Sequence, residues 1–247
     1  MLQAQGGVGD VPGYRPGLLP RGLTARAPPL IVMNDSFIGS FRGRALLLLM
    51  SKITREELLL VFRRLVARFG LDRVTMKELA REAGVSVGTI YRHFENKEAL
   101  IASIEETWLD HVRARNAQIL QREAAPEAKL YDLLVVHAAR LSEIVRTDQA
   151  AFEMLMGAVR LRYIDHDVVD TRRRIFDDMI DTAAAVMVEG TTAGQLDVAD
   201  AENTARHFVE AFAEYFSPAA IVSRPHAEVV EGVEGMFEFL MRGIRAR

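Results

Sequence analysis

The side chains best suited to chemistry lie in one short stretch of the sequence, residues 86–93. Small residues come first and side chains that form hydrogen bonds follow: Ser86, Val87, Gly88, Thr89, Tyr91, Arg92 and His93. Small residues allow a backbone to approach another molecule closely, while hydroxyl, guanidinium and imidazole groups can bond to base edges and phosphates. If this stretch is an outward-facing helix, its pattern is typical of DNA recognition.

Two short predicted helices position these residues. Thr75 and Glu78 match a capping box that begins a helix with a small, apolar inward face: Met76, Leu79, Ala80 and Ala83. Gly84 supplies a left-handed turn, and Ser86 is expected to cap a second helix over residues 87–94, which buries Ile90 and Phe94. Two helices joined in this way form a helix-turn-helix, whose second helix lies in the major groove of DNA.

Longer helices are predicted on both sides of this motif. Thr54 and Glu57 form a second capping box, and the helix after it carries an apolar stripe before Gly70 stops it: Leu58, Phe62, Leu65, Val66 and Phe69. On the other side, Asn96 is expected to cap a helix that runs from Lys97 to about Glu123.

The run from Thr75 to Ile101, TMKELAREAGVSVGTIYRHFENKEALI, resembles the DNA-binding signature of the tetracycline-repressor (TetR/AcrR) family. The turn, the Thr-Ile-Tyr-x-His-Phe core and the Asn-Lys-Glu-Ala-Leu start of the next helix all occur together. The resemblance covers residues 52–112 and implies an all-α protein. It implies an N-terminal three-helix head with a helix-turn-helix and a C-terminal helical bundle domain.

The resemblance also implies a role for each residue of the motif. Thr75 and Lys77 would contact the phosphate backbone and an edge base, and Tyr91, His93 and Lys97 would contact phosphates. Ser86, Val87, Gly88 and Thr89 would open the recognition helix. Since Val87 and Arg92 occupy positions that vary in the family, base preference is expected to depend partly on them.

Composition divides the chain into three segments. Residues 1–49 hold five of the eight prolines, eight of the 17 glycines and a net charge of +3, which indicates a disordered arm or a mis-assigned start, with Met33 and Met50 as alternative starts. Residues 50–112 are expected to be the DNA-binding domain, with the motif at 75–94. Residues 50–100 carry ten basic and seven acidic side chains, whereas residues 101–247 carry sixteen and twenty-five. A basic head on an acidic body is what a polyanion-binding domain would show.

Residues 113–247 are expected to form an effector-binding and dimerisation domain. Helices are predicted at about 126–146, 148–163, 167–189, 200–216 and 225–244. The last two have broad apolar faces, which could simply pack on the rest of the domain. The family resemblance instead implies that they pair with their copies in a homodimer through Phe208, Phe212, Tyr215, Val233, Phe237 and Leu240.

An effector pocket, if present, would lie among the helices between residues 97 and 189. Its candidate lining residues are Trp108, His137, Phe152, Met156, Tyr163 and Met179. Met and aromatic side chains at helical spacing are more often plain core than pocket lining. His137 and Arg140 could orient a ligand, although Arg140 could also pair with an acidic side chain.

The sequence also contains signals of two other chemistries. Gly84 to Gly88 matches G-x-S-x-G, the nucleophile elbow of α/β-hydrolases, which would make Ser86 an esterase nucleophile; that elbow needs a preceding strand, and a capped helix stands there instead. His166 between Asp165 and Asp167 invites a metal site, but helix connections are equally rich in Asp caps. The absence of cysteine excludes disulfides, thiolate zinc sites and thiol-based sensing.

The combined prediction is a cytoplasmic transcriptional regulator, and specifically a ligand-responsive repressor that binds a palindromic DNA operator as a homodimer. We expect no enzymatic activity, no cofactor, no metal and no membrane contact, and the sequence does not identify the small-molecule effector. The alternative from another class is a helical protein-interaction module whose helix-turn-helix does not bind DNA.

Overall fold

The structure of the protein is a computed structural model that describes residues 53–164 and 171–246, with side chains at all of these positions except 158–164. All regular secondary structure in this part is helical, apart from an isolated bridge between Leu196 and Arg245. The predictions for residues 1–49 and for His166 fall outside the described residues, as does the side chain of Tyr163. None of the described helices is long and apolar enough to cross a membrane.

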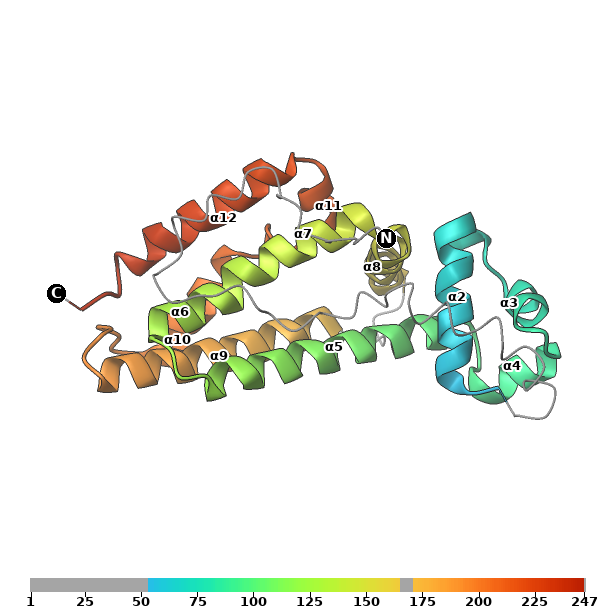
Figure 1. Cartoon of the computed structure of the whole chain (residues 1–247), viewed down its shortest axis with the longest axis horizontal. Coiled ribbons are helices and arrows are strands. Elements are labelled where there is room, and N and C mark those ends of the chain that lie inside the picture. Colours follow the sequence, from blue (N-terminus) through green and yellow to red (C-terminus); the bar gives the residue numbers. More distant parts are fainter. Residues whose placement is uncertain (1–52, 165–170, 247) are drawn as a thin grey trace, which may run out of the picture. The chain divides into compact units, whose positions relative to one another are not determined.

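The all-α prediction is confirmed by the order of the elements (Figure 1). They are α2 (Arg55–Phe69), a 3-10 turn (Leu71–Arg73), α3 (Met76–Ala83), α4 (Val87–His93), α5 (Lys97–Gln121), α6 (Pro126–Tyr131), a π-helical turn (Asp132–Val136), α7 (His137–Thr147), α8 (Gln149–Ile164), α9 (Thr171–Thr192), α10 (Ala201–Ala211), α11 (Pro218–Val222) and α12 (His226–Met241).

Local capping begins the N-terminal helices as the sequence predicts. The Thr54 hydroxyl accepts the Glu57 N–H at 3.1 Å, and the Glu57 carboxylate accepts the Thr54 N–H at 2.9 Å. The stripe on α2 is buried except for Phe69, which is 46% exposed, so that part of the prediction is wrong. The chain turns at Gly70, and Leu71 rather than Phe69 takes the buried position at this end of α2.

The N-terminal helices pack on the C-terminal ones through α2, the 3-10 turn and α8. Arg63 of α2 forms an ion pair with Asp148, the residue before α8. Leu71 packs so closely on Gly157 of α8 that a methyl group at position 157 would overlap its side chain. Gly157 therefore sets the distance between the 3-10 turn and α8.

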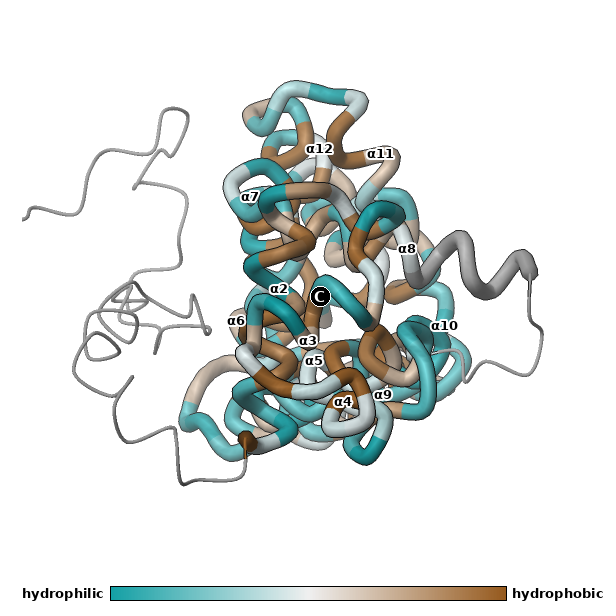
Figure 2. The backbone as a smooth tube through the Cα atoms, turned by 90° about the vertical axis from the view of Figure 1, so that its right-hand side faces the viewer, coloured by the Kyte–Doolittle hydropathy of each residue, from teal (hydrophilic) through white to brown (hydrophobic). Residues whose placement is uncertain are grey.

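The C-terminal helices enclose a separate and larger core. Helix α9 runs between α5 and α10, and α12 covers α7. Figure 2 shows apolar and polar stretches alternating along the helical tubes, as expected of amphipathic helices that bury one face. Leu130, Leu133, Ala183, Val186 and Met187 are all fully or almost fully buried there.

Two predicted helices differ in their course. The helix predicted at 126–146 contains the π-helical turn Asp132–Val136, and the one predicted at 200–216 ends at Ala211. After Ala211, tight turns carry both Phe212 and Phe216 inward, where their rings stack with centroids 6.2 Å apart. Packing of these two rings overrides the local helical pattern.

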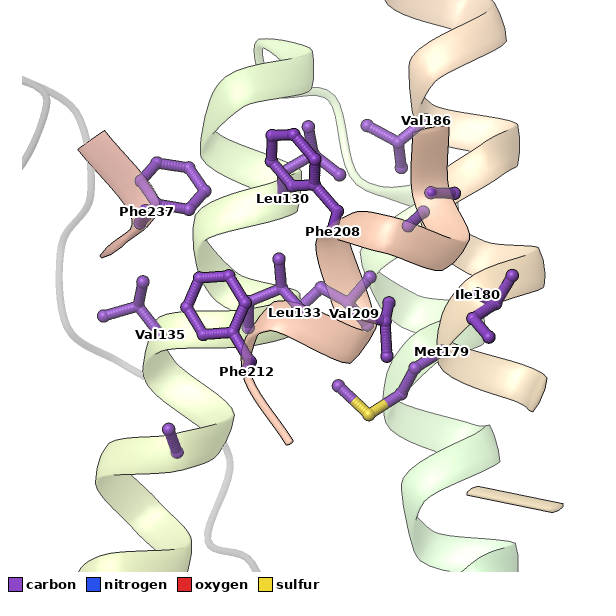
Figure 3. Close-up of a cluster of buried hydrophobic side chains, with 14 of the residues drawn as sticks. Leu130, Leu133, Val135, Met179, Ile180, Val186, Phe208, Val209, Phe212 and Phe237 are labelled. Atoms are coloured by element: carbon purple, nitrogen blue, oxygen red, sulfur yellow. The ribbon is translucent and has the colours of Figure 1, made fainter. Parts of the chain in front are cut away.

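Four of the six residues predicted at the dimer interface lie in the core of the single chain. Phe208, Phe212, Val233 and Phe237 are at most 3% exposed, and Figure 3 shows Phe208 beside Leu130 and Phe212 beside Leu133. Their broad apolar faces cover this core, so these four side chains are not available to a second copy, and this part of the prediction is corrected. Tyr215 and Leu240 are half-buried.

Candidate nucleic-acid interface

The turn of the helix-turn-helix has the geometry that its sequence predicts. Gly84 adopts φ 68° and ψ 29°, the left-handed conformation that disfavours residues with a Cβ. The Val85 N–H bonds to the Ala80 carbonyl at 3.0 Å, and Ala80 is buried. The turn therefore ends α3 and redirects the chain into α4 within three residues.

Helix α3 begins at a capping box of its own. The Thr75 hydroxyl accepts the Glu78 N–H at 3.2 Å, and the Glu78 carboxylate accepts the Thr75 N–H at 2.8 Å. This hydrogen bond from the Thr75 backbone, and then the one from its hydroxyl, lower the pKa of Glu78 below its ordinary value. Thr75 and Lys77 are exposed at this end of the helix.

A hydrogen-bonded chain of side chains orders the start of α4. The Ser86 hydroxyl accepts the Thr89 N–H at 3.1 Å and lies 2.9 Å from the Thr89 hydroxyl. The Arg92 guanidinium donates to that same Thr89 hydroxyl at 3.1 Å. Since a guanidinium only donates, the Thr89 hydroxyl accepts from Arg92 and is left to donate to Ser86. Arg92 is thus held along the surface of α4.

The outer face of α4 carries the side chains predicted to contact DNA. Tyr91 is 52% exposed, an unusual position for a large aromatic ring, and Gly88 and Arg92 are also exposed. Val87, Thr89 and His93 are half-buried. Ile90 and Phe94 are at most 2% exposed, which confirms them as the inner face. The structure brings Ser86, Val87, Gly88, Thr89, Tyr91, Arg92 and His93 together on one short helix and its cap.

Lys97 stands apart from the other predicted contacts. Its side chain is half-buried, and its ammonium group donates to the Leu71 carbonyl in the 3-10 turn. Lys97 therefore links the start of α5 to the turn between α2 and α3. Sequence reasoning assigned Lys97 to phosphate contact and missed this bond, because the sequence does not show that the turn passes the start of α5.

The residues predicted to line an effector pocket are spread over four helices of the C-terminal core. Met179 is fully buried, whereas Trp108 and Phe152 are partly buried and pack against that core. Met156 is half-buried. His137, 8% exposed, is the one titratable side chain among them that the structure describes.

His137 is bonded to a residue that the sequence did not single out. Arg115 of α5 donates to His137 Nδ1 at 2.8 Å and also donates to the Asp132 carbonyl in the π-helical turn. Burial, followed by the charges of Arg115 and Arg140, lowers the pKa of His137 to about 3. Arg115 was missed because an Arg on a long amphipathic helix is usually a surface residue.

Part of the chain is similar in sequence to known bacterial regulatory proteins. Residues 58–104 match the family described as bacterial regulatory proteins, tetR family. The HTH-type transcriptional repressor KstR2 of Mycolicibacterium smegmatis is 33% identical over 81 residues, 33% of this chain and 40% of that protein. The chain spans about half the length of the curated relatives it matches.

Two solved structures share the fold over most of the chain. FadR of Bacillus subtilis in complex with stearoyl-CoA aligns with a TM-score of 0.56 at 17% identity, over 78% of this chain and 100% of that one. A protein of Saccharomonospora viridis, described as a transcriptional regulator and in complex with choline, aligns with a TM-score of 0.57 at 19% identity, over 78% and 98%. At these identities the likeness establishes the fold alone.

Proposed function

We propose that the chain is a DNA-binding transcriptional regulator of the tetR type, because residues 58–104 match the tetR family of bacterial regulatory proteins. The observation that carries the proposal is the exposed face of α4. A ring 52% exposed and an arginine held by Thr89 have no evident structural purpose on a seven-residue helix. They suit a helix that lies in the major groove.

The proposed contacts with DNA are of two kinds: phosphate contacts position the helix, and base contacts read the sequence. Thr75, Lys77, Tyr91 and His93 are proposed to contact phosphates, which fix the helix on the duplex without reading sequence. Arg92 can reach a guanine or a phosphate, and Val87 and Thr89 can touch a thymine methyl group. Arg92 is held in place before DNA arrives, so less side-chain entropy is lost on binding.

Selection from random DNA by the full chain tests this proposal. We expect enrichment of a palindromic sequence, and we expect Arg92→Ala to change the enriched bases. Tyr91→Ala should weaken binding to all sequences similarly. Val188→Ala, which removes another exposed apolar side chain far along the sequence on α9, is the matched control and should bind as the unaltered chain does. A full chain that enriches no sequence contradicts the proposal.

A homodimer is part of the proposal, with a revised surface. A twofold-symmetric dimer places two recognition helices on two half-sites. On α12, Phe239 is 70% exposed and its neighbour Leu240 is half-buried, which makes this face a better candidate than the buried residues named from the sequence. Phe239→Glu should give monomers by light scattering with the helical content retained. A variant that remains dimeric contradicts a role for this face.

Control by a small molecule completes the proposed function. The chain would act as a repressor whose effector shifts the population between two dimer geometries and so releases the operator. The contact of α2 with Asp148 and α8 is a physical route from the C-terminal helices to the DNA-binding ones. Neighbours of the same fold are in complex with ligands as different as stearoyl-CoA and choline, so the fold alone does not indicate the effector of this chain.

We propose no enzymatic activity. Ser86, the candidate nucleophile of the G-x-S-x-G match, already accepts the Thr89 N–H as the cap of α4, and helix α3 precedes it where a hydrolase needs a strand. Hydrolysis of an ester by the unaltered chain that is lost in Ser86→Ala would contradict the absence of enzymatic activity.

A regulator that binds an operator would act in the cytoplasm, where bacterial DNA is.

A further inference from the structure

Three basic side chains meet between α5 and α7 in the C-terminal core. Arg115 comes from α5, and His137 and Arg140 lie three residues apart on one face of α7. Arg115 and Arg140 are half-buried and His137 is buried. The sequence separation of 22 residues between Arg115 and His137 is bridged by a direct 2.8 Å hydrogen bond.

Within the described residues, no carboxylate is bonded to Arg115, His137 or Arg140. Arg115 donates to a neutral ring and to a backbone carbonyl, and Arg140 forms no hydrogen bond or ion pair with any residue of the described part of the chain. The charge of Asp132 acts on Arg115, but the Asp132 carboxylate is bonded to Arg122. Burial and the charge of Arg140 lower the pKa of Arg115 to about 10. Two guanidinium groups so placed destabilise the fold unless something offsets them.

The tautomer of His137 adds a further donor. A guanidinium has no acceptor, so the bond from Arg115 requires an unprotonated Nδ1 and leaves the proton on Nε2. No hydrogen bond to Nε2 is found within the described residues. The cluster therefore offers N–H donors from Arg115, Arg140 and His137. Within the described residues, only Arg115 uses some of its donors in hydrogen bonds.

The backbone beside the cluster is irregular at the same place. The π-helical turn Asp132–Val136 precedes His137 directly, and its Asp132 carbonyl accepts from Arg115. Single π-helical turns are rare and occur often at functional sites, because they redirect the side chains that follow. Here the turn ends at the residue before His137.

We propose that Arg115, His137 and Arg140 bind the acidic group of an organic anion whose apolar body lies against the aromatic side chains next to His137. Phe216 packs edge-on to His137 with centroids 5.2 Å apart, and Phe176 of α9 packs on Phe216 at 5.7 Å. Phe176 is half-buried and so is only partly used by the core. A guanidinium pair suits a carboxylate, and the rings suit an apolar chain or ring.

This inference deepens the proposed function, since it assigns the chemical class of the effector, and it rests on that function only for its regulatory meaning. Thermal unfolding of the full chain tests it without DNA. The probes are octanoate and 3-phenylpropanoate, their uncharged amides, inorganic phosphate, and sodium chloride at matched ionic strength. The variants are Arg140→Gln, Arg140→Lys and, as a control, Arg206→Gln on the exposed surface of α10.

We expect one of the two carboxylates to raise the melting temperature of the unaltered chain by about 2–4 °C more than its amide or sodium chloride does. The shift should persist in Arg206→Gln, fall in Arg140→Lys and vanish in Arg140→Gln. Without any probe, Arg140→Gln should melt at the same temperature or higher, because it removes the repulsion with Arg115.

Three results would overturn the inference: no carboxylate shift beyond sodium chloride, a carboxylate shift that survives Arg140→Gln, or a clear loss of stability in probe-free Arg140→Gln. A shift with phosphate alone would overturn the organic part of the ligand. Because the readout needs no DNA, a chain that is stabilised by a carboxylate but selects no DNA sequence would contradict the proposed function and leave this inference standing.

Discussion

The bonds that shape the N-terminal helices and those that join the C-terminal helices span different distances in the sequence. In the first, the bonds that begin the helices are local: Thr54 with Glu57, Thr75 with Glu78, and Ser86 with Thr89. In the second, basic side chains bond across 17, 60 and 118 residues, from Arg115 to the Asp132 carbonyl, from Lys129 to Glu189, and from Arg245 to Glu127.

The N-terminal helices present side chains at their surface, whereas the C-terminal helices hold theirs between one another. Helices that cap themselves need little from their neighbours at their ends, so α3 and α4 can present exposed cations and Tyr91 to another molecule. Basic side chains that bond over long sequence distances hold the C-terminal elements relative to one another. Arg140 differs from them because it bonds to no acid within the described residues. The first region is specialised at its surface and the second in its interior.

The largest test of this contrast replaces one aromatic residue in each region. Phe212→Ala empties a fully buried site and should lower the free energy of unfolding by about 3–5 kcal/mol, measured by denaturant titration. Tyr91→Ala removes a 52% exposed ring and should change it by less than about 0.5 kcal/mol. Equal losses of unfolding free energy in the two variants would contradict this contrast between an exposed ring on α4 and a buried ring in the C-terminal core.

The difference also explains how much the sequence could predict. The helix-turn-helix and its caps were predicted to within a residue, because Thr75, Gly84, Ser86 and Asn96 act on neighbours within a few positions. The exposed side chains on α4 that are proposed to contact DNA follow from the same local pattern. Local chemistry decides local structure here.

The C-terminal region was predictable only as a set of helices. No local sequence pattern predicts the π-helical turn at Asp132–Val136 or the tight turns that bury Phe212 and Phe216, because tertiary packing decides both. The same limit made the apolar faces of the last two long helices look like a dimer interface. A broad apolar face does not reveal whether it covers its own core or a second copy.

A pH titration probes the enclosed region next. The pKa of His137 is lowered from its ordinary 6.5 to about 3 in the folded chain. As the pH falls from 6.5 towards 3, the unfolded chain takes up a proton that the folded chain refuses, so stability falls by up to about 1.4 kcal/mol per pH unit. Stability curves of His137→Asn should be flatter in this window.

The control for this titration is an exposed histidine. His207→Asn, with a side chain 70% exposed, should leave the slope of the unaltered chain unchanged. Asn at position 137 can still accept from Arg115, so the comparison isolates the titration from the loss of a hydrogen bond. A slope that is identical in the unaltered chain and in His137→Asn would contradict the enclosure of this ring.

The N-terminal cap of α3 allows a test with a smaller expected loss of stability. Thr75→Ala removes the hydroxyl that accepts the Glu78 N–H and should lower the free energy of unfolding by about 1 kcal/mol. Thr75→Ser keeps the hydroxyl and should retain most of it. If the alanine variant had no effect while the serine variant destabilised the chain, the capping explanation for the start of α3 would fail.

The last comparison is between two lysines of the N-terminal helices, one of which is expected to leave stability unchanged. Lys77 is exposed, so Lys77→Gln should leave stability unchanged and reduce the slope of log affinity for DNA against log salt by about 0.9, one phosphate contact. Lys97 is half-buried and donates to the Leu71 carbonyl, so Lys97→Gln should lower the free energy of unfolding by about 1 kcal/mol. Denaturant titration and affinity measurements at several salt concentrations compare the two variants. A stable Lys97→Gln with a reduced salt slope would return Lys97 to phosphate binding and make the DNA-binding surface wider than the exposed residues alone.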